Sequence, residues 1–510
     1  LTLRTLLFGP LRSAPVMLWP WLGAAALAPL GGLWPLRRQQ GSPIVLLWLL
    51  APILLMVVLG LFSEAFLKFL LVASPAWCVA VAGLALAGDS RTEHPNRRGF
   101  LLPVALVVAG GALLAAVLVL PAYYVDPVAR DNYAGVAAYL RVVGNPQDSL
   151  VVLDAPGQQE VWAYYDPGIP VLALPQQRPP DRMATLAALS EAIKNRRQVF
   201  ALFWATAEAD PEQLVEGWLD QQAFKGLESW QGNLRFVTYS LPGALACHDL
   251  SSAPRFGDAI SLVAVCTPLA TAQLAAGGVL PVGLRWRTSQ PLSERYKVTV
   301  QLLDGRNQLV AQRDSEPGGG SQPTDGWTPG ETVIDNHGLV IPFGTPPGEY
   351  RLLVALYQPA SGQRLPTAAG DAFQIDDVAI VQADGVVPPA IIPMNYRTDR
   401  RLGPVKLAGY DLYRTGFAHA PQTAIAAGDP LHFTFYWQAP DPLPVDWPAD
   451  QQFTLQLGAE RLTAPLAGGA YPTGGWRPGE VVRGEFDLRY DGTAKPPMLV
   501  VDGESVRLAS

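Results

Sequence analysis

Four long apolar runs in the first 122 residues are the feature that most constrains the fold of this 510-residue chain. The runs cover residues 14–36, 43–62, 69–87 and 100–120. Because a helix of about 20 apolar residues crosses a hydrocarbon core of ~30 Å, the sequence predicts about four transmembrane helices within residues 1–122. Buried core helices are the alternative, which the short polar loops between the runs disfavour.

The charges are divided unequally between this part and the rest of the chain. Residues 1–122 carry eight Lys and Arg against three Asp and Glu, whereas the remainder carries 29 against 41. Arginines in the first and third loops (residues 37, 38, 91, 97 and 98) indicate a cytoplasmic location for these loops. We therefore expect a protein of the cytoplasmic membrane, in contact with membrane lipids, whose C-terminal ~390 residues lie outside the cytoplasm. The sequence contains no basic face with interleaved aromatic residues, so it does not indicate a nucleic-acid partner.

Residues 123–242 alternate between helix and strand patterns. The strand patterns include "SLVVLDA", "IPVLALP" and "QVFALFWA", with amphipathic helix patterns between them. This alternation predicts a small Rossmann-like α/β domain with a mostly parallel sheet. The first strand is followed by "PGQQ" (residues 156–159), which lacks the glycine-rich turn of a nucleotide site. A structural or acceptor-docking role is therefore favoured over nucleotide binding.

The last 260 residues contain an internal repeat. Trp286 and Trp437 lie in similar segments 151 residues apart, and Trp327 and Trp476 lie in "PTDGWTPGE" and "PTGGWRPGE" segments 149 residues apart. Short strand patterns separated by turn signals are typical of β-sandwiches. The sequence thus predicts two tandem all-β sandwich domains, over residues 250–382 and 396–510.

The tryptophans and cysteines of this part each allow two interpretations. Sugars stack on aromatic faces, so Trp327 and Trp476 could bind glycans, although their repetition at equivalent positions favours packing roles. Cys247 and Cys266 could form a disulfide outside the cytoplasm, or remain as two buried thiols. Scattered histidines and the absence of any CxxC pair argue against a metal site, and no cofactor is expected in this chain.

A family resemblance is carried by "FSEAFLKFLLVASPAW", residues 62–77. Its pattern (R/K)-(Y/F)-L-L-x-x-x-P falls on Lys68, Phe69, Leu70, Leu71 and Pro75. Together with the order of apolar helices, basic loop, last helix and α/β domain, it resembles the C-terminal half of bacterial GT-C membrane glycosyltransferases. The protein-mannosyltransferase/aminoarabinose-transferase-like group is the most similar, over roughly residues 10–241.

This resemblance implies transfer of a sugar from a polyprenyl-phosphate carrier to an acceptor outside the cytoplasmic membrane. In that family the catalytic acid lies in the first outer loop near the N-terminus, a region with no counterpart here. No catalytic residue is therefore assigned, and a divalent metal is expected only together with such an N-terminal part. The chain begins with Leu1, which suggests a fragment, a split gene or a degenerate relative.

Glu64 and Lys68 lie between two apolar runs, on the expected outer face. Lys68 could attract the phosphate of a lipid-linked sugar as a point charge. The alternative is structural: a Glu and a Lys four residues apart can pair on one helix face, and a lysine near a helix end can reach the membrane interface.

Two functional hypotheses follow. The first is the C-terminal part of a GT-C-like glycosyltransferase, not catalytic by itself. The alternative is a non-catalytic membrane-anchored surface protein or complex subunit, whose β-sandwiches bind glycans or partner proteins and whose helices dock onto other membrane subunits. A nucleotide-binding regulator built on the α/β domain is a third, weaker possibility.

Overall fold

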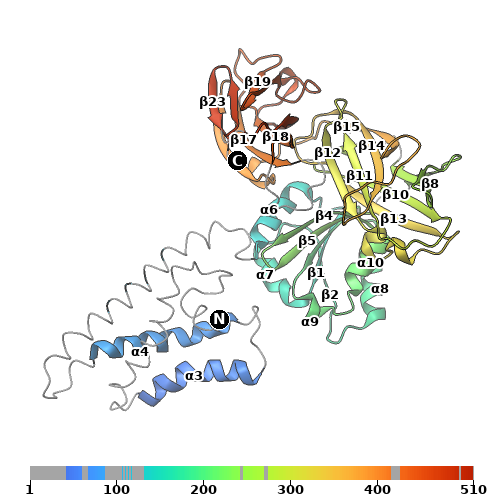
Figure 1. The fold of residues 1–510 in the computed structure, drawn as a ribbon. Helices are drawn as coiled ribbons and strands as arrows, with labels where there is room; N and C mark the ends of the chain where they lie inside the picture. The colour runs from blue at the N-terminus through green and yellow to red at the C-terminus, as the bar shows by residue number, and fades with distance from the viewer. Residues whose placement is uncertain are drawn as a thin grey trace. The chain divides into compact units, whose positions relative to one another are not determined.

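The fold is that of a computed structural model. It describes residues 42–59, 67–86, 106, 110, 113, 117, 131–241, 245–268, 274–414, 426–492 and 496–508. The chain divides into two compact units, Leu1–Asp131 and Asn132–Ser510. Each unit is described by itself below (Figure 1).

The first unit contradicts the prediction of about four transmembrane helices. Its described helices are α3 (Ser42–Val58), the 3₁₀-helix η2 (Leu67–Ala73) and α4 (Ser74–Leu86). In the part of the chain that the structure describes, no helix is long and apolar enough to cross a membrane. The predicted span 14–36 lies outside the described residues, as does all of 100–120 except four separate positions.

The lengths of α3 and α4 explain why the transmembrane prediction from the apolar runs is wrong. α3 has 17 residues and α4 has 13, which at 1.5 Å per residue correspond to about 26 Å and about 20 Å of helix. The run 69–87 is divided because Pro75 lacks a backbone N–H and fits only the first turn of an α-helix. α4 accordingly begins at Ser74, and the residues before it form the 3₁₀-helix.

The second unit begins with the α/β domain. Its helical segments are α6 (Tyr133–Val143), η4 (Pro156–Gln158), α7 (Gln159–Tyr165), α8 (Arg182–Ala192), α9 (Thr206–Ala209) and α10 (Leu214–Gln222). Its strands are β1 (Ser149–Asp154), β2 (Val171–Leu174), β3 (Gln198–Phe203), β4 (Phe224–Gln231) and β5 (Leu234–Ser240). The sheet order is β2-β1-β3-β5-β4.

This sheet is mixed and covered on both faces. β1 pairs in parallel with β2 and β3, whereas β5 is antiparallel to β3 and to β4. One face packs against α6 and α7 through residues such as Leu140 and Trp162, and the other against α8 and α10 through Leu189 and Val215 (Figure 1). The central strands are continuous apolar runs that are buried on both faces, which accounts for this three-layer arrangement.

The first sandwich is built from two sheets around a shared apolar core. Its strands are β6 (Leu245–Asp249), β7 (Arg255–Phe256), β8 (Ile260–Pro268), β9 (Leu274–Ala275), β10 (Val279–Thr288), β11 (Lys297–Leu303), β12 (Leu309–Ser315), β13 (Thr332–Val340), β14 (Gly348–Tyr357) and β15 (Phe373–Val381). The 3₁₀-helices η5 (Pro317–Gly320) and η6 (Thr324–Gly326) precede β13. The sheet orders are β13-β10-β8-β6, with β7 beside β8, and β12-β11-β14-β15-β9.

The second sandwich follows the 3₁₀-helix η7 (Pro389–Ile391). Its strands are β16 (Tyr396–Leu402), β17 (Val405–Arg414), β18 (Pro430–Gln438), β19 (Gln452–Leu457), β20 (Glu460–Pro465), β21 (Val481–Arg489), β22 (Met498–Val501) and β23 (Glu504–Arg507), with η8 (Thr473–Gly475) before β21. The sheet orders are β16-β17-β18-β21 and β20-β19-β22-β23.

The two sandwiches repeat each other down to strand register. Trp286 in β10 pairs with Val333 in β13, and Trp437 in β18 pairs with Val482 in β21. Both tryptophans are fully buried in their cores. Equivalent tryptophans therefore occupy equivalent places, as expected from a duplicated sandwich.

Candidate functional site

Four side chains from four strands form a row along the carboxyl edge of the α/β sheet. Asp154, the last residue of β1, pairs in register with Phe203 of β3. Phe203 pairs with Arg235 of β5, and Arg235 with Trp230 of β4. Residues paired across neighbouring strands project from the same face of a sheet. The row therefore lies on the face that α8 and α10 cover.

The row begins at the point where the sheet changes winding direction. β1 lies between β2 and β3, and the helices α7 and α8, which connect these strands, lie on opposite faces of the sheet (Figure 1). In open α/β sheets, ligands bind outside the carboxyl ends of the strands at such a point. Ala155 after β1 and Ala205 after β3 both have positive φ, at 149° and 50°. Such backbone conformations are uncommon for residues other than glycine and cluster at functional sites.

Asp154 is a buried carboxyl group without a partner. It is 1% exposed, and its Oδ1 forms no hydrogen bond. Burial raises the pKa of Asp154 to about 8, and the nearby carboxylates of Asp210 and Glu216 add to this rise, whereas Arg235 opposes it. A carboxyl group with this pKa is largely protonated at neutral pH, so it can donate a hydrogen bond as well as accept one.

Asp210 supplies a second buried carboxylate beside the first. It is 0% exposed; its Oδ2 accepts a hydrogen bond from the backbone N–H of Val215 at 2.9 Å, and its Oδ1 has no partner. The Val215 bond fixes the carboxylate at the start of α10. Buried carboxylate oxygens without a hydrogen-bond partner are costly.

Arg235 separates this buried end of the row from solvent. Its Nη1 donates to Glu216 Oε1 at 2.7 Å, its Nη2 pairs with the other oxygen of Glu216, and Lys225 Nζ lies 2.9 Å from Glu216 Oε1. Burial alone would raise the pKa of Glu216, but the Arg235 and Lys225 contacts lower it. The guanidinium carbon lies 4.6 Å from the ring centre of Phe203 and 6.0 Å from that of Trp230.

Trp230 forms the solvent-facing end of the row. It is 63% exposed, which is unusual for a residue whose apolar area normally favours burial. The row thus runs from a buried hydrogen-bonding group to an exposed aromatic face. This combination suits a ligand with one apolar ring face and several hydroxyl groups.

The tryptophans singled out in the sequence lie elsewhere and are buried. Trp327 is 6% exposed and Trp476 is 3% exposed, each packed in the core of its sandwich. Trp327 Nε1 donates to the carbonyl of Gln322 at 3.0 Å, and Trp476 Nε1 to that of Tyr471 at 3.1 Å. These equivalent bonds indicate a packing role, and neither ring is open for stacking by a glycan.

The remaining sequence-predicted residues fall into two groups. Cys247 and Cys266 face each other across β6 and β8 and form a disulfide. Lys68 belongs to η2, whereas Glu64 lies outside the described residues. Among the described residues no group of three or more His, Cys, Asp or Glu side chains could hold a metal ion.

Comparisons with known proteins do not assign a family. No family model matches the chain, and no curated protein matches it. A glycosyl hydrolase family 2 member from Bacteroides cellulosilyticus is 16% identical over 30% of this chain and 16% of its own length, with a TM-score of 0.16. An endonuclease/exonuclease/phosphatase from Beutenbergia cavernae is 9% identical over 38% of this chain and 58% of its own, with a TM-score of 0.15.

A DUF4785 family protein from Legionella pneumophila is likewise 9% identical over 54% of this chain and 58% of its own, with a TM-score of 0.15. The chain spans less than two thirds of the length of each of these structures. Scores this low carry no argument about fold or function. The resemblance to GT-C glycosyltransferases stays a prediction.

Proposed function

We propose that this chain is a non-catalytic saccharide-binding protein whose α/β domain holds the ligand at the carboxyl edge of its sheet. The observation that carries the proposal is the row from buried Asp154 to exposed Trp230. A pyranose ring stacks its C–H face on the exposed indole of Trp230, and its hydroxyl groups hydrogen-bond to the partly exposed Arg235 and Glu228 side chains, while Asp154 lies buried behind Arg235.

Gln158 supports a saccharide over a nucleotide. The side chain of Gln158 is buried between β1 and β3, where its Nε2 donates to the carbonyls of Asp154 at 3.2 Å and Leu202 at 3.3 Å. Its Oε1 accepts from the Tyr133 hydroxyl at 2.9 Å. Gln158 thus occupies the carboxyl edge between β1 and β3 on this face, and we infer that a ligand approaches from the face that carries Trp230.

The disulfide supports a location outside the cytoplasm, because disulfides persist in oxidising compartments. A saccharide-binding protein in such a compartment would meet cell-surface or environmental glycans. This location is part of the proposal.

The proposal is tested with the full chain on a glycan array, followed by calorimetric titration of the strongest ligand. Trp230→Ala should weaken binding at least about tenfold, because it removes the stacking surface. Tyr164→Ala is the matched control, since Tyr164 is an 84% exposed aromatic residue on α7 of the same domain. Equal affinities of the wild type and Trp230→Ala would refute the proposed site.

A further inference from the structure

A groove of about 280 Å³ lies at one end of the second sandwich, away from the row in the α/β domain. It is formed by the β16–β17 turn, the segment that follows β18, and the turn before β21. Its lining residues are Arg401, Pro404, Val405, Lys406, Gln438, Ala439, Pro440, Asp441 and Gly479. Ligand pockets commonly measure about 300–1,000 Å³, so this volume suits a ligand of the size of one sugar residue.

Two cations line one side of the groove. Arg401 of β16 and Lys406 of β17 are register partners across the hairpin, so their side chains project from the same face. Arg401 Nε donates to the carbonyl of Gly403 at 3.3 Å. Lys406 Nζ lies 2.9 Å from Asp399 Oδ1, but both side chains are exposed, and such a pair contributes little.

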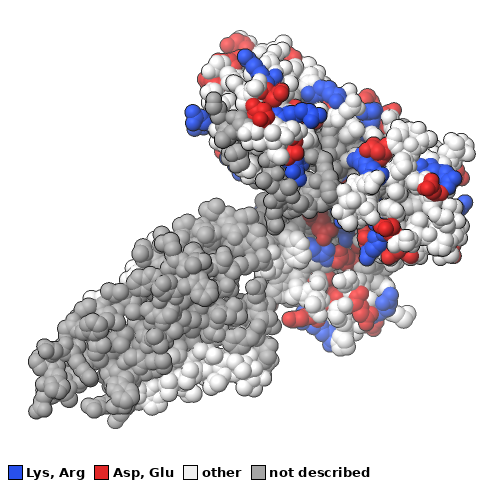
Figure 2. Space-filling model, in the orientation of Figure 1, with Lys and Arg blue, Asp and Glu red and all other residues white. Residues whose placement is uncertain are grey.

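This local positive charge contrasts with the rest of the chain. The net charge of the protein is −7, and Figure 2 shows acidic and basic side chains interspersed over the second unit on the face drawn. The hairpin β16–β17 brings Arg400, Arg401 and Lys406 close together, and carboxylates lie near them as well: Asp399 pairs with Lys406, and Glu504 Oε2 accepts a hydrogen bond from the N–H of Gly403 at 3.0 Å. Within the groove lining, the cations Arg401 and Lys406 outnumber the single carboxylate of Asp441, so an anion is attracted to the side of the groove that they form.

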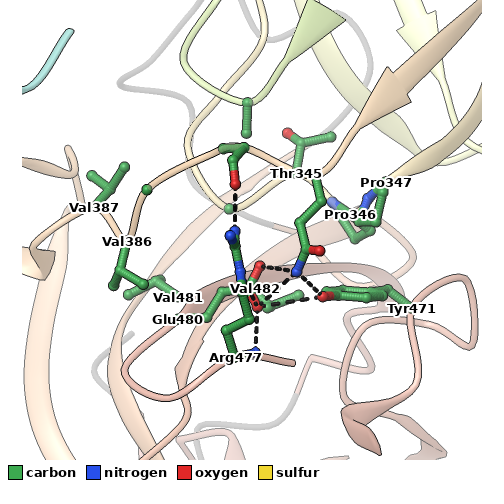
Figure 3. Close-up of a pocket in the computed structure, with 15 residues that line it drawn as sticks. Thr345, Pro346, Pro347, Val386, Val387, Tyr471, Arg477, Glu480, Val481 and Val482 are labelled. Carbon is green, nitrogen blue, oxygen red and sulfur yellow. Dashed lines mark hydrogen bonds and ion pairs between the residues drawn. The ribbon is translucent and has the colours of Figure 1, made fainter. Parts of the chain in front are cut away.

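The groove residue Gly479 lies in the chain between Arg477 and Glu480, and both of these belong to the hydrogen-bond network shown in Figure 3. Arg477 donates to the carbonyls of Ala383 and Asp384, and its backbone N–H donates to Glu480 Oε2 at 2.7 Å. Gln382 Nε2 donates to the Tyr471 hydroxyl at 2.5 Å.

The cavity drawn in Figure 3 measures only about 30 Å³, which accommodates about one water molecule. This cavity is therefore too small for a sugar residue, unlike the groove. On the groove side, the N–H of Ala439 donates to the carbonyl of Glu480 at 2.9 Å, and that of Gly479 to Pro440 at 3.2 Å. Two walls of the groove are thus joined by backbone bonds, which favours a preformed site.

We propose that this groove binds an acidic sugar, a hexuronate residue, independently of the site in the α/β domain. The carboxylate pairs with Arg401 and Lys406, since a guanidinium can bind a carboxylate with two parallel hydrogen bonds. The hydroxyl groups meet Gln438 and Asp441, which offer both donors and acceptors. The apolar ring face lies on Val405, Ala439 and Pro440.

The test uses the full chain and titration calorimetry with D-glucuronate, D-glucose and acetate. Glucuronate should bind at least about tenfold more tightly than either of the other two, because only it offers both the charge and the ring. Acetate binding as tightly as glucuronate would mean a general anion effect and would overturn the proposal.

Arg401→Gln and Lys406→Gln should each weaken glucuronate binding about five- to tenfold, as expected for a lost charge-assisted hydrogen bond. Arg400→Gln is the matched control, being an exposed arginine on the same strand that does not line the groove. Circular dichroism checks that each variant folds. Unchanged affinity in folded Arg401→Gln and Lys406→Gln would refute the site. Trp230→Ala should retain glucuronate binding, so a failure of the groove proposal can be distinguished from a failure of the proposed function.

Discussion

His432 Nε2 lies 2.8 Å from Glu485 Oε2, while its Nδ1 lies 2.7 Å from Asp487 Oδ1. The imidazole is buried, and both of its nitrogens face carboxylates. Burial lowers the pKa of His432, but the hydrogen bonds to Asp487 and Glu485 outweigh this effect and raise it to about 9. The imidazolium therefore joins β18 to β21 as a doubly bonded cation.

We predict that the ion pairs of His432 with Glu485 and Asp487 make the free energy of unfolding depend on pH. Because the folded pKa of about 9 exceeds the unfolded value of 6.5, the stabilisation is complete below pH 6.5 and is lost as the pH rises through about 9. Its size is about 3 kcal/mol, from 1.36 kcal/mol per pKa unit. The urea midpoint of the wild type should fall more steeply over this range than that of His432→Gln, which retains only the pH dependence of the other groups, Asp154 among them.

His248→Gln is the control, since this histidine of β6 is exposed. It should retain the wild-type pH dependence. Parallel curves for the wild type and His432→Gln would contradict the prediction.

Asp154→Asn should increase stability at alkaline pH. The folded pKa of Asp154, about 8, lies above its unfolded value of 3.8, so the wild type loses stability as the pH rises from about 4 to about 8. Asparagine has the same shape and no charge, and it removes this loss. We expect the variant to have a higher urea midpoint than the wild type at pH 8 and a smaller difference at pH 4.

Glu160→Gln on α7 provides the comparison, because Glu160 is exposed and acidic in the same domain. It should follow the wild type at both pH values. If Asp154→Asn were destabilised equally at pH 4 and pH 8, the ionisation of Asp154 would have no part in stability.

Much of the β-rich half of the fold could be predicted from the sequence. The two tryptophan offsets identified the repeat because buried aromatic residues at fixed strand positions determine packing. The register of Trp286 and Trp437 agrees with this duplication. Strands β1, β2 and β3 were likewise recognisable as continuous apolar runs, as expected for buried parallel strands.

The candidate site could not be predicted, because it depends on strand pairing. β4 was missed since its apolar residues Phe224, Leu227 and Trp230 recur every third position and do not alternate. A bulge between Lys225 and Glu228 produces this spacing. Without β4 and its register with β5, the sequence does not show that Trp230 and Asp154 belong to one row of side chains. The position of Asp154 at the end of a predicted strand was one indication of a site.

The transmembrane prediction was wrong for a different physical reason. The length of an apolar run sets an upper limit on a helix, but proline and local capping determine where the helix begins. Pro75 places a helix start inside the third run, and the resulting α4 is too short.

Thr324 and Thr473 should be essential to the repeated turns. Thr324 Oγ1 donates to the carbonyl of Glu294 at 2.8 Å and accepts from the N–H of Tyr296 at 2.9 Å. Thr473 Oγ1 bonds the carbonyl of Pro448 and the N–H of Gln451 at the same distances.

Replacing either threonine by valine keeps the shape but removes both hydrogen bonds, which are partly or fully buried, at a combined cost of about 1–3 kcal/mol. Urea unfolding of Thr324→Val and Thr473→Val measures this loss. The serine variants retain the hydroxyl group and should be affected less. Valine variants as stable as the serine variants would show that these bonds do not stabilise the turns.

Gly338 should control the contact between the α/β domain and the first sandwich. A Cβ atom at Gly338 of β13 would lie 2.7 Å from the carbonyl oxygen of Phe224 and 2.8 Å from the carbonyl carbon of Lys225, both in the backbone of β4. Backbone atoms cannot yield as a flexible side chain can, so Gly338→Ala must separate β13 from β4. We expect a destabilisation of about 1–3 kcal/mol by urea unfolding, as for other overpacked sites, and a larger radius of gyration by solution X-ray scattering. Gly326→Ala is the matched control, because a Cβ there meets nothing within 4 Å. An unchanged radius and midpoint for Gly338→Ala would show that the two strands do not pack this closely in solution.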